Sequence, residues 1–523
     1  MAGPRPAGRG WDYAPAPESR EIVTIAAEYG LFLDGTFSPA ADGREFPTIN
    51  PATEEPLARV ALAGPADVDR AVAAARQAYE QVWGSMPGAE RAKYLYRIAR
   101  ILQERAREFA VLESLDNGKP IRESRDVDVP LAAAHFFYYA GWADKLEYAG
   151  IGGASGAGMT GGDGGASRTG VAGGTGGASR TGVAGGTGRG VAPRPLGVAG
   201  QVIPWNFPLL MAAWKLAPAL ATGNTCVLKP AETTPLTALL LAEVCQQADL
   251  PPGVVNVLTG AGQTGSALVG HPGVNKIAFT GAIEVGKEIS RAVAGTGKRL
   301  TLELGGKAAN VVFDDAPVDQ AVEGIVNGIF FNQGHVCCAG SRLLVQESVA
   351  DIVVERLRER LATLRLGDPL DKNTDIGAIN SREQLDKISA LSAIGEAEGA
   401  QRWSPPCRLP ERGYWFPPTV FTGVSQSYRI AREEIFGPVL SVLTFRTPEE
   451  AVTKANNTPY GLSAGVWTEK GSRILWMAQR LRAGVVWANT YNRFDPASPF
   501  GGYRESGFGR EGGRHGLAAY LDA

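Results

Sequence analysis

The chain has 523 residues, of which 44% are apolar, with 52 basic and 54 acidic residues and a formal net charge of −2. This length predicts about two to four globular domains. The balanced charge, without a basic block, excludes a nucleic-acid footprint, and no apolar run reaches the roughly 18 residues that a membrane span needs. Five cysteines and four histidines show no metal-ligand or disulfide spacing, and no signal peptide is evident. We therefore expect a cytoplasmic protein without a bound metal.

The first part of the chain predicts a mobile arm followed by a hairpin and helices. Residues 1–20 are rich in Pro, Gly, Ala and Arg, which is typical of a disordered segment. Two short apolar runs flank Asp-Gly within 31–37, a hairpin signal. Apolar residues at helical spacing then predict a helix that begins at Pro65, a second over about 89–115 and a third over about 127–146.

Residues 148–194 interrupt this pattern, because they are nearly all Gly, Ala, Ser, Thr and Arg. The twelve-residue unit GGASRTGVAGGT occurs at 164–175 and again at 176–187. Such a short, glycine-rich unit cannot build a core, so we expect a flexible linker. A nucleotide-binding glycine loop is disfavoured, since no strand leads into the segment and no helix leaves it.

From Leu196 onward strands and helices alternate, which predicts a mainly parallel sheet covered by helices. The predicted strands are 196–204, 225–229, 253–259 and 276–280, and the predicted helices are 208–220, 235–248 and 284–293, with Pro218 favouring an early end or a kink. A second α/β unit follows Glu303, with strands at 310–313 and 343–345 and a helix over 349–364. The last residues, 497–523, look loop-like. In such sheets ligands bind beyond the carboxyl ends of the strands.

Four motifs carry groups that could perform chemistry: PWNFP at 204–208, ELGGK at 303–307, FFNQGHVCCAG at 330–340 and EEIFGP at 433–438. Cys337 could attack a carbonyl carbon as a thiolate, or it could simply be a packed cysteine. Asn206 could donate to an oxyanion, or cap the helix that follows it. Glu303 could activate water, or be a solvated loop acid.

In this order the four motifs resemble the NAD(P)-dependent aldehyde dehydrogenase family, over about residues 32–520. The resemblance implies an α/β fold with a Rossmann-type coenzyme-binding domain at 21–147 and 195–303. It also implies an α/β catalytic domain at 304–505, a tail at 506–523 and a small oligomerisation element. The glycine-rich insert and the early stop at Ala523 both disrupt that element, so we expect a homodimer rather than a tetramer.

The resemblance also assigns the catalytic residues. Cys337 is the nucleophile, and Asn206 with the Cys337 amide stabilises the oxyanion. Glu303 is the general base, and Lys215 and Glu511 match positions proposed to pass protons. His335 stands where the family usually has Gln, and we expect it to face a loop without a catalytic role.

Residues that match the cofactor site of the family favour NAD over NADP. Glu232 beside Lys229 would bind the ribose hydroxyls and repel a 2′-phosphate, although the two could also form a simple surface ion pair. Glu434 would hold the nicotinamide ribose, with Phe436 beside the ring. The remaining positions are Ile203, Pro204, Trp205, Gly262, Phe279, Thr280, Gly281, Gly286 and Leu304. Ala282 replaces a serine that is common in relatives, which removes one neutral hydrogen bond of roughly 0.5–1.5 kcal/mol.

The family's substrate tunnel corresponds to Phe207, Met211, Trp214, Phe494 and Phe500, although aromatic residues at such spacing are more often core. Val336, Asn492 and Arg493 are the variable positions expected to tune specificity. The expected reaction is oxidation of a small-molecule aldehyde to the carboxylic acid with NAD through a thioester on Cys337. Two alternatives are an acylating or semialdehyde-specific relative, which Glu303 and a CoA-dependence assay would separate, and a weak or inactive dehydrogenase-like scaffold.

Overall fold

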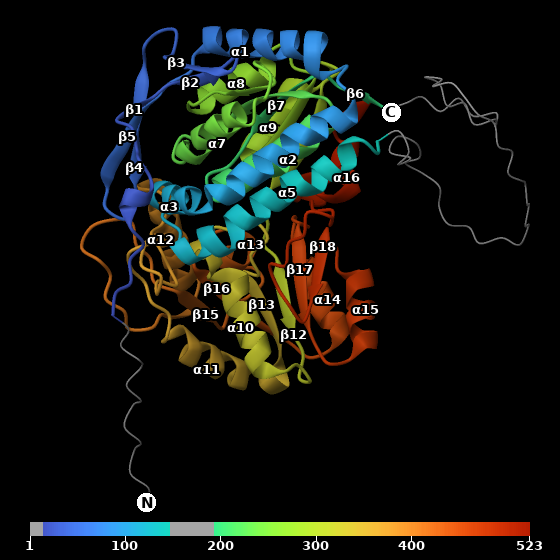
Figure 1. The fold of residues 1–523 in the computed structure, drawn as a ribbon. Coiled ribbons are helices and arrows are strands. Elements are labelled where there is room, and N and C mark those ends of the chain that lie inside the picture. Colours follow the sequence, from blue (N-terminus) through green and yellow to red (C-terminus); the bar gives the residue numbers. More distant parts are fainter. Residues whose placement is uncertain (1–13, 147–192, 523) are drawn as a thin grey trace, which may run out of the picture.

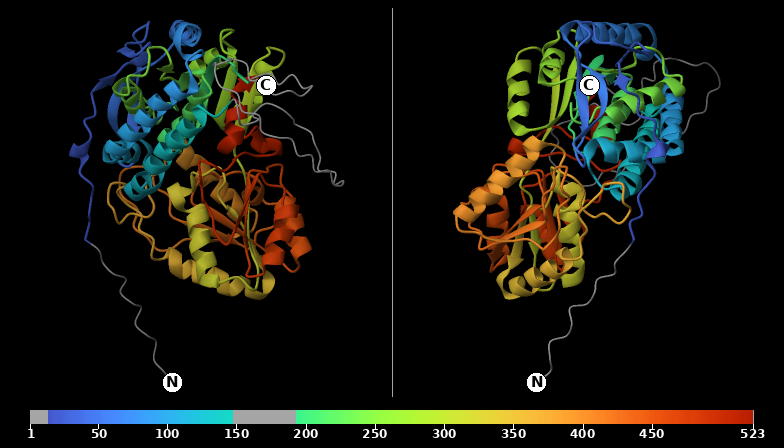
Figure 2. Two further views of the ribbon diagram at one scale, coloured as in Figure 1. Left: turned by 45° about the vertical axis from the view of Figure 1, so that its right-hand side comes forward. Right: turned by 90° about the vertical axis from the view of Figure 1, so that its left-hand side faces the viewer.

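The computed structural model describes residues 14–146 and 193–522, which form two α/β halves stacked on one another (Figure 1). The blue-to-green half lies above the yellow-to-red half, and two further views show the same division (Figure 2). Each half is built on a mainly parallel sheet covered by helices, so the predicted α/β fold class is confirmed. The predicted flexible insert, 148–194, lies outside the described residues except for its last two positions.

The upper half is built on an eight-stranded sheet in the order β19-β11-β10-β7-β8-β9-β2-β3. The five central strands, from β11 to β9, run parallel, and β19 and β2 join them antiparallel. The strands are β2 (Leu31–Leu33), β3 (Thr36–Ser38), β7 (Val198–Val202), β8 (Thr225–Lys229), β9 (Val255–Val257), β10 (Lys276–Gly281), β11 (Arg299–Leu304) and β19 (Gly507–Phe508). The predicted hairpin at 31–37 is therefore confirmed as β2 and β3.

Helices from two stretches of the chain, 65–143 and 208–293, cover this sheet. They are α1 (Pro65–Ala78), α2 (Gly88–Glu104), α3 (Ala106–Asn117), α4 (Ile121–Glu123), α5 (Val129–Ala143), α6 (Pro208–Ala221), α7 (Leu236–Gln247), α8 (Gly262–Gly270) and α9 (Ile283–Val293). The single helix predicted over 89–115 is wrong, because the backbone leaves the helical region at Arg105 (φ −94°, ψ 15°). The side chain of Arg105 binds Glu108 and Glu243 at this turn.

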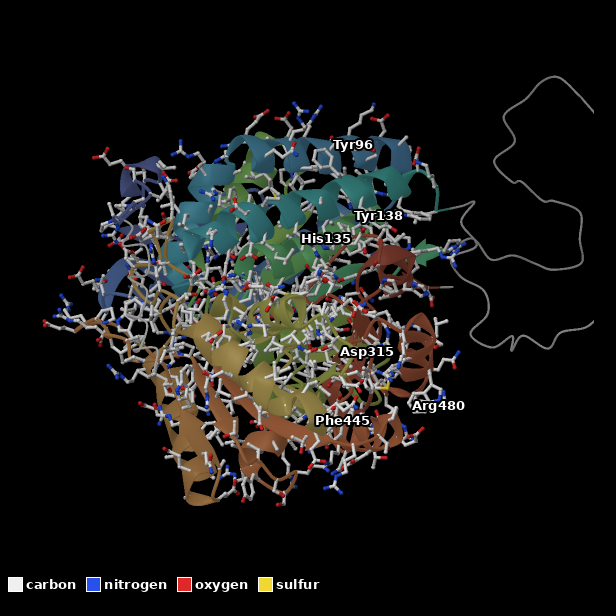
Figure 3. The ribbon with its side chains drawn as sticks, turned by 90° about the horizontal axis from the view of Figure 1, so that it is seen from below. Tyr96, His135, Tyr138, Asp315, Phe445 and Arg480 are labelled. Atoms are coloured by element: carbon white, nitrogen blue, oxygen red, sulfur yellow. The ribbon has the colours of Figure 1, made fainter. Side chains whose placement is uncertain are left out.

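Helix α6 continues through Pro218 to Ala221, so the predicted early end is also wrong. Proline removes one main-chain donor, but α6 is apolar and buried on nearly every side, and this packing retains the helix. Seen from below, His135 lies on α5, which packs against α6, and its side chain is fully buried (Figure 3). Helices α5 and α6 thus pack together, and Pro208, the last residue of the PWNFP motif, begins α6.

The lower half is a seven-stranded sheet in the order β14-β15-β16-β13-β12-β17-β18, parallel except for β14. Its strands are β12 (Ala309–Val312), β13 (Arg342–Gln346), β14 (Gln401–Trp403), β15 (Thr419–Thr422), β16 (Val439–Phe445), β17 (Ser463–Trp467) and β18 (Val485–Ala488). Its helices are α10 (Val318–Ile329), α11 (Ala350–Leu361), α12 (Arg382–Ala397), α13 (Arg429–Arg432), α14 (Pro448–Asn456) and α15 (Gly471–Arg480). Phe445 packs edge to face on Phe313 in its core.

The first and last described residues contact the rest of the molecule. Strand β19, the helix α16 (Gly513–Ala518) and β20 (Leu521–Asp522) lie in the stretch predicted to be loop-like, so that prediction is wrong there. Strand β20 pairs with β6 (Arg194–Pro195), and a separate sheet joins β1 (Glu28–Tyr29), β5 (Glu55–Ala61) and β4 (Glu45–Asn50). At the other end, Pro17 bridges Asp371 and Glu18 pairs with Arg107, so the described end of the expected arm is held in place.

Candidate active site

A cavity of about 1150 Å³ lies between the two halves, and both contribute to its walls. The PWNFP and ELGGK motifs reach it from the upper half, and the Cys337 loop and Glu434 from the lower half. The predicted site residues that line it are Pro204, Trp205, Asn206, Phe207, Met211, Trp214, Thr280, Gly281, Glu303, Leu304, Cys337, Glu434, Phe436, Phe494, Phe500 and Glu511. Segments far apart in the sequence therefore meet in one place.

The topology explains why they meet. Strands β7, β8, β10 and β11 are parallel neighbours, and all end at the same edge of the sheet. Ile203 follows β7, Lys229 ends β8, Gly281 ends β10 and Leu304 ends β11. The carboxyl edge of such a sheet is where ligands bind. Ile203, Lys215, Lys229, Glu232, Gly262, Phe279 and Gly286 do not line the cavity itself.

Cys337 is the partly exposed thiol of the cavity, whereas its neighbour Cys338 is buried. The Cys338 carbonyl accepts hydrogen bonds from the hydroxyls of Ser463 and Tyr491, both at 2.9 Å, which fix the backbone beside the nucleophile. A hydrogen bond with the Cys338 thiol, together with burial, raises the pKa of Cys337 well above its usual value. The raised pKa favours the protonated thiol, which would have to lose its proton to act as a nucleophile.

Asn206 is directed at the nucleophile loop. Its Nδ2 donates a hydrogen bond of 2.8 Å to the main-chain carbonyl of His335. The N-cap position of α6 is Phe207, and it receives no side-chain cap. The alternative role of Asn206 as a helix cap is therefore wrong. One N–H of the carboxamide is used by His335, and the other is left to donate toward the cavity.

Glu303 is buried, and within the described residues neither of its carboxylate oxygens has a hydrogen-bond partner. Burial and the nearby Glu511 carboxylate raise the pKa of Glu303 well above its usual value. Lys215 Nζ, which is fully buried, forms an ion pair with Glu511 Oε1. The three side chains thus form one buried charged group that opens into the cavity at Glu303 and Glu511.

The residues predicted to hold the cofactor fall into two groups by their distance from the cavity. Near the nucleophile, Glu434 Oε1 accepts from the Gly306 amide at 3.0 Å, and burial raises the pKa of Glu434 to about 7. Phe436 packs edge to face on Trp205 with ring centroids 5.3 Å apart. Beyond the cavity, Lys229 Nζ lies 3.3 Å from Glu232 Oε2. Glu232 is half exposed, so its carboxylate retains capacity to accept hydrogen bonds.

Close backbone approach and unused polar groups suit this edge of the sheet to a dinucleotide. A Cβ on Gly286 would lie 2.6 Å from a terminal methyl group of Leu304, so a larger residue there would displace that side chain. Gly262 at the start of α8 has nothing within 4 Å of its Cβ position, which leaves its backbone open. The buried Thr280 hydroxyl lines the cavity without a partner in the described chain. Phe279 is buried just before it in β10.

Three aromatic rings close the other end of the cavity. Trp214 packs against Phe494 (centroids 6.2 Å, 77°) and Phe500 (5.6 Å, 60°), which are 5.8 Å from each other. Phe207 stacks on Phe331, and Met211 lines the same wall. Val336, Asn492 and Arg493, the expected specificity positions, also line the cavity. These walls are largely apolar, as a site for an organic substrate requires.

His335 faces loop residues, as expected. Its side chain is fully buried, its ring lies edge-on to Trp205 at 4.8 Å and stacks on Phe436 at 5.9 Å, and burial lowers its pKa to about 3. It is therefore a neutral packing residue between two loops.

Sequence reasoning also missed residues that support the site from behind. Asn332 was visible in the FFNQG motif but received no role. The side-chain Nδ2 of Asn332 donates to the main-chain carbonyl of Asn206 at 2.7 Å, and the main-chain N–H of Asn332 donates to Glu123 Oε2 at 2.8 Å. Lys119 beside it is completely buried. The one available signal was an unusual density of charged residues, Glu113 to Asp128, in a stretch that also had to be packed.

Within residues 14–146 and 193–522, no group of three or more His, Cys, Asp or Glu side chains could hold a metal ion. No helix in that part of the chain is long and apolar enough to cross a membrane.

Known proteins resemble this chain in both sequence and structure. The profile of the aldehyde dehydrogenase family matches residues 37–523. The protein DhaS of Bacillus subtilis (strain 168) is 45% identical over 494 residues, which cover 94% of each chain. The mitochondrial aldehyde dehydrogenase of Homo sapiens is 43% identical over 512 residues, covering 97% of this chain and 93% of that protein. The structure of an NAD+ complex of aldehyde dehydrogenase from Bacillus cereus matches with a TM-score of 0.87 at 39% identity, covering 97% of this chain and 98% of that chain. The chain belongs to the aldehyde dehydrogenase family.

Proposed function

We propose that this protein oxidises an aldehyde to the carboxylic acid through a covalent intermediate on Cys337, with NAD+ as the hydride acceptor. The observation that carries the proposal is the meeting of Cys337, Asn206 and Glu303 in one cavity. A thiol, an amide donor and an unpaired carboxylate are the three groups that an acyl-transfer route of this kind needs.

In the first half of the reaction, the Cys337 sulfur attacks the aldehyde carbon as the thiol proton passes to water in the open cavity. The carbonyl oxygen becomes an oxyanion, which the free N–H of Asn206 and the Cys337 amide stabilise. A dinucleotide held by the predicted cofactor residues would supply the hydride acceptor. With the hydride removed, the carbon–oxygen double bond reforms, which leaves a thioester on Cys337.

In the second half, Glu303 takes a proton from water as the water attacks the thioester. The carbon–sulfur bond breaks, the carboxylic acid leaves, and the released sulfur takes a proton from water to restore the thiol. Glu303 must be ionised to act, although its pKa is raised. Lys215 and Glu511, which are paired behind it, are positioned to pass the proton onward.

The cofactor preference follows from Glu232. Its half-exposed carboxylate follows β8, where a ribose would lie, and it would accept hydrogen bonds from the 2′- and 3′-hydroxyls. A 2′-phosphate would be repelled, so NAD is favoured over NADP. Lys229, Glu434 and the backbone at Gly262 and Gly281 would hold the rest of the dinucleotide.

The test is a substrate panel of aldehydes followed by NADH absorbance, with two variants. Cys337→Ala should abolish turnover and the NADH burst. Glu303→Gln should retain the burst and slow the steady state, because only the hydrolytic half needs the base. Retained turnover in Cys337→Ala would refute the proposal, and loss of the burst in Glu303→Gln would remove Glu303 from that role. No observation favours the non-catalytic scaffold, and CoA-independent acid formation would separate the enzyme from acylating relatives.

We further propose that the protein is a cytoplasmic homodimer. Within the described chain, β18 is an edge strand of the lower sheet and has one paired neighbour. An edge of this kind is available for pairing with another subunit. Light scattering of the purified protein would measure the oligomeric state directly.

A further inference from the structure

The loop that carries the nucleophile has a strained backbone. Asn332, Gln333 and Gly334, just before Cys337, all have positive φ angles of 49°, 51° and 77°. Two of the three are not glycine, and such residues adopt this conformation only when surrounding contacts determine it. Contacts outside the loop must therefore hold it.

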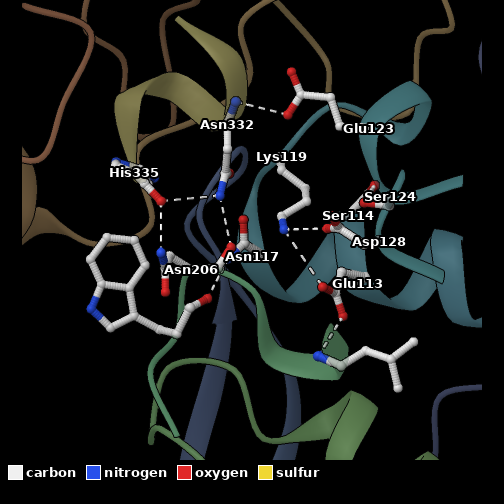
Figure 4. Close-up of polar contacts among 12 residues, drawn as sticks. Glu113, Ser114, Asn117, Lys119, Glu123, Ser124, Asp128, Asn206, Asn332 and His335 are labelled. Carbon is white, nitrogen blue, oxygen red and sulfur yellow. Dashed lines mark hydrogen bonds and ion pairs between the residues drawn. The ribbon is translucent and has the colours of Figure 1, made fainter. Parts of the chain in front are cut away.

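Hydrogen bonds from the segment before α5 supply this support (Figure 4). Glu123 Oε2 accepts from the Asn332 amide at 2.8 Å. Asn332 Nδ2 then donates to the Asn206 carbonyl at 2.7 Å, and Asn206 Nδ2 donates back to the His335 carbonyl at 2.8 Å. Asn206 is thus tied to the nucleophile loop by both its main chain and its side chain, and Glu123 anchors the loop side of this arrangement.

A buried charge cluster interacts electrostatically with Glu123 and contacts the residues that follow Asn206. Lys119 Nζ lies 2.5 Å from Asp128 Oδ2 and 3.6 Å from Glu113 Oε1, and all three side chains are fully buried. The same ammonium lies 4.2 Å from the centre of the Phe207 ring. Glu113 Oε2 accepts from the Leu209 amide at 3.3 Å, in the first turn of α6. The cluster therefore contacts Phe207 and Leu209, which directly follow Asn206 in the chain.

These contacts meet a geometric requirement of the reaction. An oxyanion donor acts only when its N–H lies at hydrogen-bond distance from the developing charge, and a shift of about 1 Å costs up to about 100-fold in rate. A rigid link between the donor and the nucleophile is what the chain of hydrogen bonds through Asn332 provides. Glu123 touches neither the cavity-lining thiol nor any group that reacts.

We propose that Glu123, supported by Lys119, is a positioning residue that sets Asn206 relative to Cys337 through Asn332. The inference rests on the proposed function, because it assigns Asn206 the oxyanion role. Its rival is a purely structural carboxylate, whose loss would lower stability without a specific effect on acylation.

The experiment compares three variants with the wild-type protein. Glu123→Ala removes the acceptor for the Asn332 amide, and Glu123→Gln retains an acceptor oxygen without the charge. Asp116→Ala is the matched control, since Asp116 is an equally buried carboxylate of α3 that accepts from the Leu236 amide and does not contact the nucleophile loop. The measurements are the pre-steady-state NADH burst rate, NAD+ affinity by calorimetry, and the thermal midpoint.

We expect Glu123→Ala to slow the burst at least tenfold with unchanged NAD+ affinity. The burst rates of Glu123→Gln and Asp116→Ala should stay within about threefold of the wild-type rate, even if their thermal midpoints fall as far as that of Glu123→Ala. An unchanged burst in Glu123→Ala overturns the proposal. An equal loss in Asp116→Ala or in Glu123→Gln also overturns it, because either result means that the acceptor for Asn332 is not the cause.

A second readout does not depend on dehydrogenase activity. The rate of Cys337 alkylation by iodoacetamide, followed by mass spectrometry of its peptide, should rise at least threefold in Glu123→Ala and stay at the wild-type rate in Asp116→Ala, because a released loop exposes the thiol. If the wild-type protein oxidised no aldehyde, the proposed function would fail while this measurement still decided whether Glu123 holds the loop.

Discussion

Phe500 and Glu511 face each other across an antiparallel bridge and exchange two main-chain hydrogen bonds, of 2.6 and 2.8 Å. Phe500 forms part of the aromatic wall of the cavity, and Glu511 is the buried partner of Lys215. The substrate wall and the charged group behind Glu303 are therefore fixed to one another. The C-terminal segment therefore contributes residues to the candidate active site.

The first prediction concerns this buried pair. Glu511→Gln should destabilise the protein by about 3–5 kcal/mol, because Lys215 is left as a buried cation without a counter-charge. Urea unfolding measures the change. The double variant Lys215→Met with Glu511→Gln should recover part of that loss, since no isolated charge remains. Additive losses in the double variant would show that the pair is not coupled.

The second prediction concerns the pH at which Cys337 reacts. The Cys338 thiol is the largest cause of the raised Cys337 pKa, so Cys338→Ala should lower that pKa. The backbone is held by Ser463 and Tyr491 through the Cys338 carbonyl, which the variant retains. The alkylation rate of Cys337, measured against pH, should therefore rise at lower pH than in the wild type. A profile that does not move would mean that burial alone sets the pKa.

The sequence could predict where Asn206 and Glu303 meet, because they lie at the carboxyl ends of β7 and β11, where parallel topology forces convergence. Cys337 lies between α10 and β13, so only its motif identified it. It could not predict how Asn206 is used, since an asparagine before a helix serves equally well as a cap until its partner, the His335 carbonyl, is known. Lys119 and Glu123 were missed because buried charges follow no periodic pattern. The break at Arg105 and the continuation through Pro218 depend on tertiary packing, which local propensity does not contain.

The third prediction tests the hold on Glu434. In Gly305→Ala the new Cβ would lie 2.1 Å from Glu434 Oε2, so the carboxylate must move away from the Gly306 amide. We expect NAD+ to bind about tenfold more weakly, about 1.4 kcal/mol, in calorimetric titration. Gly471→Ala is the control, since nothing lies within 4 Å of its Cβ position. Unchanged NAD+ affinity in Gly305→Ala would remove Glu434 from the cofactor site.

The fourth prediction concerns stability against pH. Burial raises the pKa of Glu123 from 4.5 to about 8, with Lys119 and Arg122 opposing that shift and Asp128 adding to it. Between these values the folded protein retains a proton that the unfolded chain releases, so ionisation lowers the stability of the wild type as pH rises. Glu123→Gln does not titrate. The free energy of unfolding of Glu123→Gln minus that of the wild type should therefore increase by about 1–3 kcal/mol between pH 5 and pH 8.

Urea unfolding at several pH values measures that difference. Glu113 and Asp128 titrate in both proteins, so their contributions largely cancel. A difference that is constant between pH 5 and pH 8 would mean that Glu123 has no raised pKa in the folded state.

The last prediction restores a hydroxyl at Ala282. This residue is the N-cap of α9, and no side chain caps the helix there. Serine at an N-cap typically stabilises a helix by about 0.5–2 kcal/mol relative to alanine. Ala282 also lines the cavity beside Thr280 and Gly281, so Ala282→Ser should both raise the unfolding free energy and strengthen NAD+ binding. Lys470→Ser is the matched control: it occupies the uncapped N-cap of α15 in the other half, and it should gain stability alone. Equal NAD+ affinity in the two variants would mean that the hydroxyl reaches only the helix amides and not the cofactor.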